Sequence, residues 1–103
     1  MRCCVMKKQI LYVGLKDKDT KKQEVSKAQA RNIIIDICGD CTLSDSIGAY
    51  THEDGTTIKE KTIRVELLFK TSKEVKRMAQ DIKEKLNQET IGYEVVNTNS
   101  ILL

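Results

Sequence analysis

The order of apolar and polar residues along the chain predicts four strands. Residues 9–15 are almost all apolar, which is typical of a central strand covered on both faces. Residues 57–69 instead alternate, so that one side of this predicted strand is apolar and the other polar. Segments 42–51 and 91–96 supply the other two strands. The apolar side of the alternating strand consists of Ile63, Val65, Leu67 and Phe69.

A helix is predicted between the first two strands. Thr20 and Gln23 have the spacing of a capping box, which places the start of the helix there, and Gly39 is a natural C-terminal cap. The β-branched run at 33–35 lowers helix propensity and is also compatible with a strand, so tertiary packing decides between the two. The apolar positions are Val25, Ala28, Ala30, Ile33, Ile34 and Ile37.

A second helix follows the alternating strand. Thr71 fits an N-cap, with Glu74 three residues later. The apolar residues that recur at helical spacing are Val75, Met78, Ala79, Ile82 and Leu86. Polar residues occupy the opposite side, so the helix is amphipathic and packs one face on a core.

Segments 42–51 and 57–69 form a predicted hairpin. They flank His52-Glu53-Asp54-Gly55, in which Asp-Gly is a strong signal for a hairpin turn. Both arms are longer than the typical strand of about five or six residues. The part from 50 to 60 is therefore expected to project beyond the core and to need a partner.

The element order predicts a ferredoxin-like α+β fold. The order is β-α-β-β-α-β, which gives a four-stranded antiparallel sheet with both helices on one face. We expect a single domain over 1–103, with an N-terminal arm at 1–7 and a docking tail at 97–103. The face without helices is expected to meet a ligand or another subunit. Its predicted residues are Tyr12, Tyr50, Arg64, Glu66 and Leu68.

Charge and composition exclude two classes of partner. The net charge is only +3, from 18 basic and 15 acidic residues, and aromatic residues make up 4% of the chain. Nucleic-acid binding is therefore not expected, because it needs concentrated basic charge or several stacking rings. No segment is long and apolar enough for a membrane span or a secretory signal, so we expect a cytoplasmic protein without a membrane partner.

Two groups of residues are candidates for binding a small ligand. Lys16, Lys18, Lys21 and Lys22 surround the predicted start of the first helix, where free backbone donors favour an anion. The alternative is a solvated loop, because Asp17 and Asp19 partly cancel the lysine charge.

The second group lies in and beside the projecting hairpin, and consists of Gly48, Tyr50, His52 and Arg64. Gly48 allows close backbone approach, Tyr50 offers a stacking face and Arg64 a forked donor. The alternative is packing of the hairpin between subunits. His52 is the only histidine, but polar residues of this kind are typical of turns, and the sequence holds no catalytic motif. We therefore expect no enzyme activity and no cofactor.

Cys38 and Cys41 have the spacing of a metal-chelating or redox pair. They follow the predicted C-terminus of a helix, whose dipole disfavours a thiolate, and ordinary reduced thiols are the simpler interpretation. We expect no metal site, although the sequence does not settle whether these two residues bind metal.

The predicted layout with its long 42–69 hairpin resembles small regulatory modules of the PII, CutA and ACT kinds. That resemblance implies an oligomer that binds small ligands between subunits, but no diagnostic motif carries functional residues over. Segments 11–20 and 47–55 are also similar to small uncharacterised proteins of Firmicutes phages and mobile elements. This second resemblance implies an anti-defence role.

Together these observations predict a non-catalytic homo-oligomer that binds a small anionic, nucleotide-like ligand and sequesters it as a phage anti-defence protein. One alternative is an inhibitor that binds a host protein through its exposed sheet or hairpin edge. Another is a cysteine-based metal or redox module.

Overall fold

The computed structural model describes the backbone at residues 3–51, 54–101 and 103, and the side chains in these ranges except those at 3–6, 50 and 58. The elements are β1 (Cys3–Gly14), α1 (Lys27–Cys38), β2 (Thr42–Thr51), β3 (Thr57–Leu67), α2 (Ser72–Lys85) and β4 (Gly92–Ile101). The strands form one antiparallel sheet in the order β2-β3-β1-β4. The predicted ferredoxin-like fold is confirmed.

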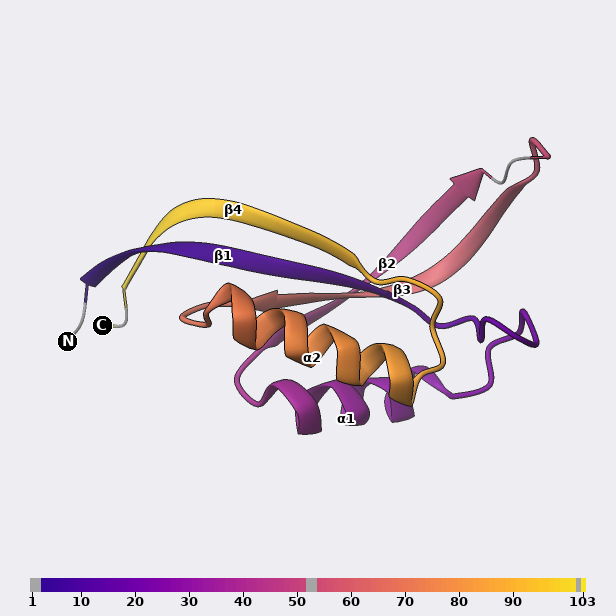
Figure 1. Cartoon of the computed structure of the whole chain (residues 1–103), viewed down its shortest axis with the longest axis horizontal. Coiled ribbons are helices and arrows are strands. Elements are labelled where there is room, and N and C mark those ends of the chain that lie inside the picture. The colour runs from indigo at the N-terminus through magenta and orange to yellow at the C-terminus, as the bar shows by residue number, and fades with distance from the viewer. Residues whose placement is uncertain (1–2, 52–53, 102) are drawn as a thin grey trace.

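Both helices lie on one face of the sheet (Figure 1). The β2–β3 ribbon extends past the helices at one end of the molecule, and β1 with β4 extends past them at the other. The result is elongated, with principal extents of 49 × 28 × 22 Å. Two ribbons thus project from one small core.

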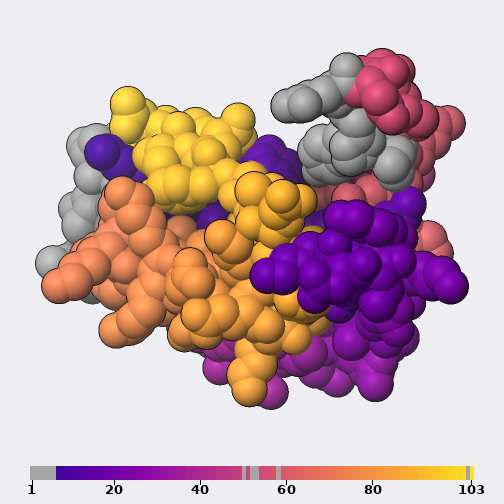
Figure 2. Space-filling view, turned by 45° about the vertical axis from the view of Figure 1, so that its right-hand side comes forward, coloured from indigo at the N-terminus to yellow at the C-terminus, as the bar shows by residue number. Residues whose placement is uncertain are grey.

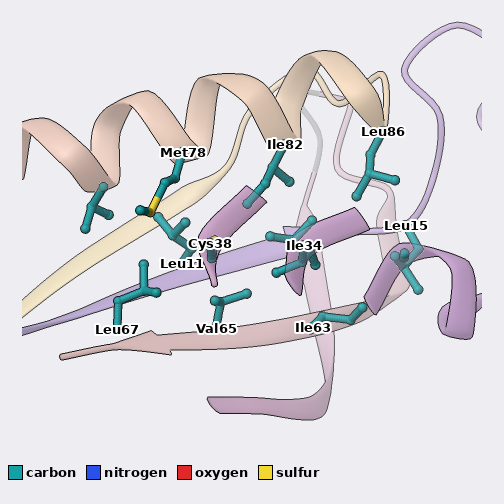
Figure 3. Close-up of a cluster of buried hydrophobic side chains, with 13 residues drawn as sticks. Leu11, Leu15, Ile34, Cys38, Ile63, Val65, Leu67, Met78, Ile82 and Leu86 are labelled. Atoms are coloured by element: carbon teal, nitrogen blue, oxygen red, sulfur yellow. The ribbon is translucent and has the colours of Figure 1, made fainter. Parts of the chain in front are cut away.

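The core lies between the helices and one face of the sheet (Figure 3). Alternate residues of β1 and β3 point into it, as expected for strands with a single buried face. Ile34 comes from α1, and Val75, Met78 and Ile82 come from α2. The side chains that β1 and β3 contribute to this core are Leu11, Val13, Ile63, Val65 and Leu67. Gln9 and Ile10 of β1 are also fully buried but are not part of this cluster.

The first helix begins later than the sequence indicates. Its N-cap is Ser26, whose side chain accepts a hydrogen bond from the backbone N–H of Gln29 while the Gln29 side chain accepts from Ser26. Thr20 instead donates its hydroxyl hydrogen bond to Glu24 within the preceding loop. The predicted helix start at Thr20 is wrong. Thr20 with Gln23 and Ser26 with Gln29 both have the residue types and spacing of a capping box, and the helix begins at the second pair. Residues 33–35 are helical, so the helix, and not the strand that the sequence also allows, is confirmed there.

The second helix confirms its predicted cap. Thr71 accepts a hydrogen bond from the Glu74 backbone N–H, at 3.1 Å, and the Glu74 side chain accepts one from the Thr71 backbone. We expect Thr71→Ala to lower the free energy of unfolding by about 1 kcal/mol, the usual cost of losing an N-cap side chain. Urea denaturation of the two proteins would measure it. Thr71→Ser, which keeps the hydroxyl, is the control and should restore most of the loss; no difference between Ala and Ser would contradict the role of the cap.

The strand ends differ from the prediction at two places. β3 ends at Leu67, and Phe69 adopts a positive φ of 59°, so Phe69 does not continue the alternation. Segments 3–7 and 97–101, expected as an arm and a docking tail, pair with each other and lengthen β1 and β4.

In the part of the chain that the structure describes, no helix is long and apolar enough to cross a membrane.

Candidate functional site

A cavity of about 560 Å³ lies where β1 ends and β4 begins. Figure 2 shows the surface hollowed between β4 (yellow) and the β2–β3 ribbon (rose), with β1 (indigo) between them. The walls come from the ends of β1, β3 and β4, from the loop after β1, and from the connection between α2 and β4. The lining residues are Tyr12, Gly14, Lys16, Asp17, Lys18, Lys21, Glu60, Gln88, Glu89, Thr90, Ile91 and Gly92.

Glu60 is held at the cavity wall by the backbone of β1 and the loop after it. The backbone N–H of Lys16 donates to its Oε1 at 3.0 Å. The carboxylate lies over Gly14: a Cβ on Gly14 would come within 2.1 Å of Glu60 Oε1. A larger residue at position 14 would force the carboxylate aside, so Gly14 and Lys16 together set its position. Its Oε2 has no hydrogen-bond partner among the described residues.

Gln88 is the buried polar residue of the site, with 6% of its surface exposed. Its Nε2 donates to the carbonyl oxygens of Lys16, at 2.8 Å, and Leu86, at 3.2 Å. These bonds tie the α2–β4 connection to the loop after β1. Because both segments line the cavity, Gln88 fixes the distance between two of its walls.

Asn87 makes a second tie between the same two segments. Its Nδ2 donates to Asp17 Oδ2 at 3.0 Å and to Asp19 Oδ2 at 2.8 Å, while its carbonyl oxygen accepts from the Lys18 N–H at 2.9 Å. Asp17 also accepts from the backbone N–H groups of Asp19 and Thr20. The hydrogen bond from Asn87 is the main cause that lowers the pKa of Asp17 from its ordinary value of 3.8, and the two backbone donors lower it further.

This lowered pKa predicts how the loop responds to acid. A depressed folded-state pKa means that the Asp17 contribution to stability is present above 3.8 and is lost as the pH falls through the lower, folded-state value. We therefore expect the backbone amide NMR signal of Thr20, which donates to the Asp17 carboxylate, to titrate with a midpoint below pH 3.8. Asp17→Asn should abolish that titration, and a midpoint at or above the ordinary value would contradict the hydrogen-bonded geometry.

Three of the four predicted lysines line the cavity. These are Lys16, Lys18 and Lys21, whereas Lys22 is exposed and is not part of the lining. They do not surround a helix N-terminus, as the sequence suggested, because α1 begins at Lys27. The loop that carries them is held instead by its own backbone hydrogen bonds, from Asp17 to Lys22 and from Lys21 to Asp17.

Gly48 and Arg64, two residues of the second predicted group, lie on the sheet face without helices. Strand register places Gly48 opposite Glu60, and Arg64 opposite Tyr12, so each is the neighbour of a cavity residue. Arg64 itself donates to Glu66, which also pairs with Lys8 at 3.7 Å. The expected ligand donor is therefore engaged within the sheet. Tyr50 lies on β2 opposite Ile58, while His52 falls outside the described residues.

Sequence reasoning missed several residues of the cavity. Glu60 belongs to the polar side of β3, where nothing distinguishes it from the other charged positions. Gln88, Glu89, Thr90 and Gly92 lie in or beside a connection without periodicity. The one usable signal was Gly14 at the end of an apolar strand, because a strand glycine often marks a close approach of other groups.

The cysteine pair is separate from the cavity lining. Cys38 is buried and Cys41 partly buried, and both are free thiols. Burial raises the pKa of Cys38 to about 11 and also raises that of Cys41, so both carry their protons at neutral pH. Among the described residues, no group of three or more metal-ligating side chains is close enough to hold an ion.

The cavity thus combines both signs of charge with apolar surface. Lys16, Lys18 and Lys21 line it together with Asp17, Glu60 and Glu89, and Tyr12 and Ile91 are also part of the lining. A volume of this size holds a molecule of nucleoside dimensions, since small-molecule sites typically span about 300–1,000 Å³. Such a lining suits a compound that carries a ring, a cation and an anion together.

Comparison with solved structures places the fold beside enzymes and small regulatory proteins. A phage SAM lyase in complex with S-methyl-5'-thioadenosine aligns with a TM-score of 0.70 and 17% identity, over 94% of this chain and 85% of that one. A phage SAM lyase in its apo state aligns with a TM-score of 0.66 and 16% identity, over 88% of this chain and 79% of that one. The PII-like protein CutA from Nostoc gives 0.54 and 16%, over 90% and 81%. No family model and no curated protein sequence matches the chain.

These comparisons confirm the resemblance to PII-like and CutA-like modules and to phage proteins. They contradict the expectation that the chain is not an enzyme. A phage SAM lyase, which is an enzyme, has the same fold over 94% of this chain. The absence of a familiar motif therefore does not exclude activity.

Proposed function

We propose that this protein is a lyase of the phage type that binds S-adenosylmethionine, or a closely related nucleoside sulfonium, in the 560 Å³ cavity. The observation that carries the proposal is the carboxylate of Glu60, which lies against the bare backbone of Gly14 with one oxygen unpaired. The match of the fold to a SAM lyase supports it.

The ligand and the lining are complementary in charge. S-adenosylmethionine carries a sulfonium and an ammonium group, both cationic, together with one carboxylate. We assign Glu60 to the cationic part, and Lys16, Lys18 and Lys21 to the carboxylate. Tyr12 and Ile91 offer apolar surface to the adenine ring. The site would therefore hold the amino-acid portion of the ligand at its cationic groups and at its carboxylate.

The proposed reaction breaks the bond between the sulfur and the γ-carbon of the amino-acid side chain. The electron pair of that bond goes to the sulfur, and the neutral thioether S-methyl-5'-thioadenosine leaves. The γ-carbon regains an electron pair in one of two ways. The ligand's own carboxylate oxygen closes a lactone, with no proton transfer, or a β-proton passes to a base and an alkene forms.

The test is product analysis with purified protein. We expect incubation with S-adenosylmethionine to release S-methyl-5'-thioadenosine in amounts that grow with enzyme concentration, as measured by liquid chromatography and mass spectrometry. The second fragment, lactone or unsaturated amino acid, identifies the route. Calorimetric binding of S-methyl-5'-thioadenosine without turnover would limit the function to sequestration, and neither binding nor turnover would refute the proposal.

The remaining parts of the expected biology are consistent with this activity. Loss of S-adenosylmethionine would deprive methyl-transferring enzymes of a host cell of their substrate, which is one way in which a phage protein acts against defence.

A homo-oligomer is also part of the proposal, because the projecting ribbons expose apolar residues that a single copy does not cover.

A further inference from the structure

A groove of about 280 Å³ lies between α2 and β4, apart from the cavity described above. It shares only Thr90 and Ile91 with the lining of that cavity. Leu11 and Val75 are fully buried and close the bottom of the groove, while polar residues of α2 form its rim. The apolar lining residues are Leu11, Val75, Ala79, Ile91 and Tyr93, and the polar ones are Lys76, Gln80, Lys83 and Thr90.

The ring of Tyr93 is a fixed apolar wall of this groove. Its hydroxyl donates a hydrogen bond to Oε1 of Gln9, a buried residue whose Nε2 donates in turn to the carbonyl oxygen of Lys70 at 2.7 Å. Tyr93 is nevertheless 39% exposed. Because the hydroxyl is engaged inside the protein, the ring is the part that remains for a ligand. The groove therefore offers an aromatic surface held in one orientation, which favours a flat apolar group.

The charge on the rim of the groove is positive and uncompensated. Lys76 and Lys83 border the groove, and the described residues of its lining include no aspartate or glutamate. Within the described part of the chain, neither lysine forms an ion pair. The nearby carboxylate of Glu84 accepts a hydrogen bond from the Gln80 amide, at 3.1 Å. An anionic ligand would therefore meet two ammonium groups that have no ionic partner in the protein.

The size of the groove suits one ring with a short arm. Its volume is half that of the 560 Å³ cavity, so it is small for a nucleoside. An apolar cavity of about 150 Å³ is large enough for benzene. The remaining space accommodates a short chain that reaches the rim, where the lysines lie. The apolar bottom, the aromatic wall and the cationic rim together fit an aromatic ring that carries a carboxylate.

We propose that this groove is a second ligand site, which binds a small aromatic carboxylate with its ring beside Tyr93 and its carboxylate at Lys83. Lys83 is the assigned partner because it is half-buried, whereas Lys76 is exposed. A charged hydrogen bond is stronger where water is partly excluded. The site does not depend on the proposed lyase activity, because its residues form the groove whether or not the cavity binds S-adenosylmethionine.

The test uses phenylacetate as the probe and the intact chain without any other ligand. In two-dimensional amide NMR, we expect saturable shifts at Ala79, Ile91 and Tyr93, with a dissociation constant below about 1 mM. Phenylacetamide has the same ring without the charge, and it should bind at least about 10-fold more weakly. Acetate, which lacks the ring, should cause no saturable shift. Equal affinity for phenylacetate and phenylacetamide would contradict the role of the lysine.

Three substitutions locate the site. Lys83→Gln should weaken phenylacetate binding about 10-fold. Ala79→Leu should abolish it, because the larger side chain fills the groove. Lys73→Gln removes the same charge from α2 outside the lining and should leave the affinity unchanged. Circular dichroism should show that the variants fold; if Ala79→Leu does not, the two lysine variants still decide.

Two results would overturn the proposal. The first is the absence of shifts at Ala79 and Tyr93 in the wild-type protein, which would mean that the groove is covered by another copy of the chain or takes no ligand of this class. The second is an equal loss of affinity in Lys83→Gln and Lys73→Gln, which would mean that the overall charge of α2, and not a site at the groove, attracts the carboxylate.

Discussion

Glu60→Gln is expected to weaken binding of S-adenosylmethionine about 10- to 100-fold, because a hydrogen bond to a charged group contributes roughly 1.5–3 kcal/mol. The substitution keeps the shape of the side chain and an oxygen that accepts from the Lys16 N–H. It removes the negative charge that the site presents to a cationic ligand. Isothermal titration calorimetry would measure the change.

The same variant separates two roles for the carboxylate. If Glu60 only binds the cation, kcat under saturating ligand stays within a few-fold of wild type while KM rises. If it also takes a proton, kcat itself falls by about 100-fold or more. Glu84→Gln makes the same change of charge on α2, outside the cavity, and should leave both constants unchanged. Equal losses in the two variants would show that net charge, and not the site, controls binding.

The sequence predicts the fold well because its strongest signals are repeated. The apolar spacing of Val75, Met78 and Ile82 allows only one buried face on α2, and all three side chains are buried. The alternation from Ile63 to Leu67 likewise fixes the side of β3 that meets the helices. Several residues support each of these inferences, so one ambiguous position does not change them.

Single-residue signals are less reliable, as the start of α1 demonstrates. Thr20 with Gln23 and Ser26 with Gln29 both have capping residues at the correct spacing. The choice between them depends on the loop, in which Asp17 and Lys22 pair through their backbones and Asn87 holds the loop from a distant segment. That contact is seventy positions away in sequence. Local patterns contain no information about it.

The cavity was predictable only in part for the same reason. The lysines were noticed because they cluster along the chain, and three of them do line it. Glu60 comes from a different strand, and its significance arises from its position over Gly14. Neither residue is unusual by itself. Their relation depends on how the end of β1 lies against β3, which strand pairing in three dimensions determines.

Gly14→Ala is expected to reduce ligand affinity by about the same factor as the loss of the Glu60 carboxylate, since a misplacement of about 1 Å can cost roughly 100-fold in a well-ordered site. The added Cβ would lie 2.1 Å from Glu60 Oε1 and 3.2 Å from Gln88 Oε1. The end of the Glu60 side chain is the group free to move, so the protein should still fold with little loss of stability. Thermal denaturation and calorimetry would measure the two effects separately.

A double substitution tests whether Gly14 acts through Glu60. In a Glu60→Ala background the carboxylate that Cβ would contact is absent, so Gly14→Ala should cause no further loss of affinity. Additive losses would mean that Gly14 influences the ligand directly or through Gln88. If the Gly14→Ala variant binds the ligand with wild-type affinity, binding does not require the Glu60 carboxylate to lie over β1, and the central argument for the site is wrong. If Gly14→Ala causes no further loss of affinity in the Glu60→Ala background, the absence of a side chain at Gly14 acts on the ligand by positioning the Glu60 carboxylate.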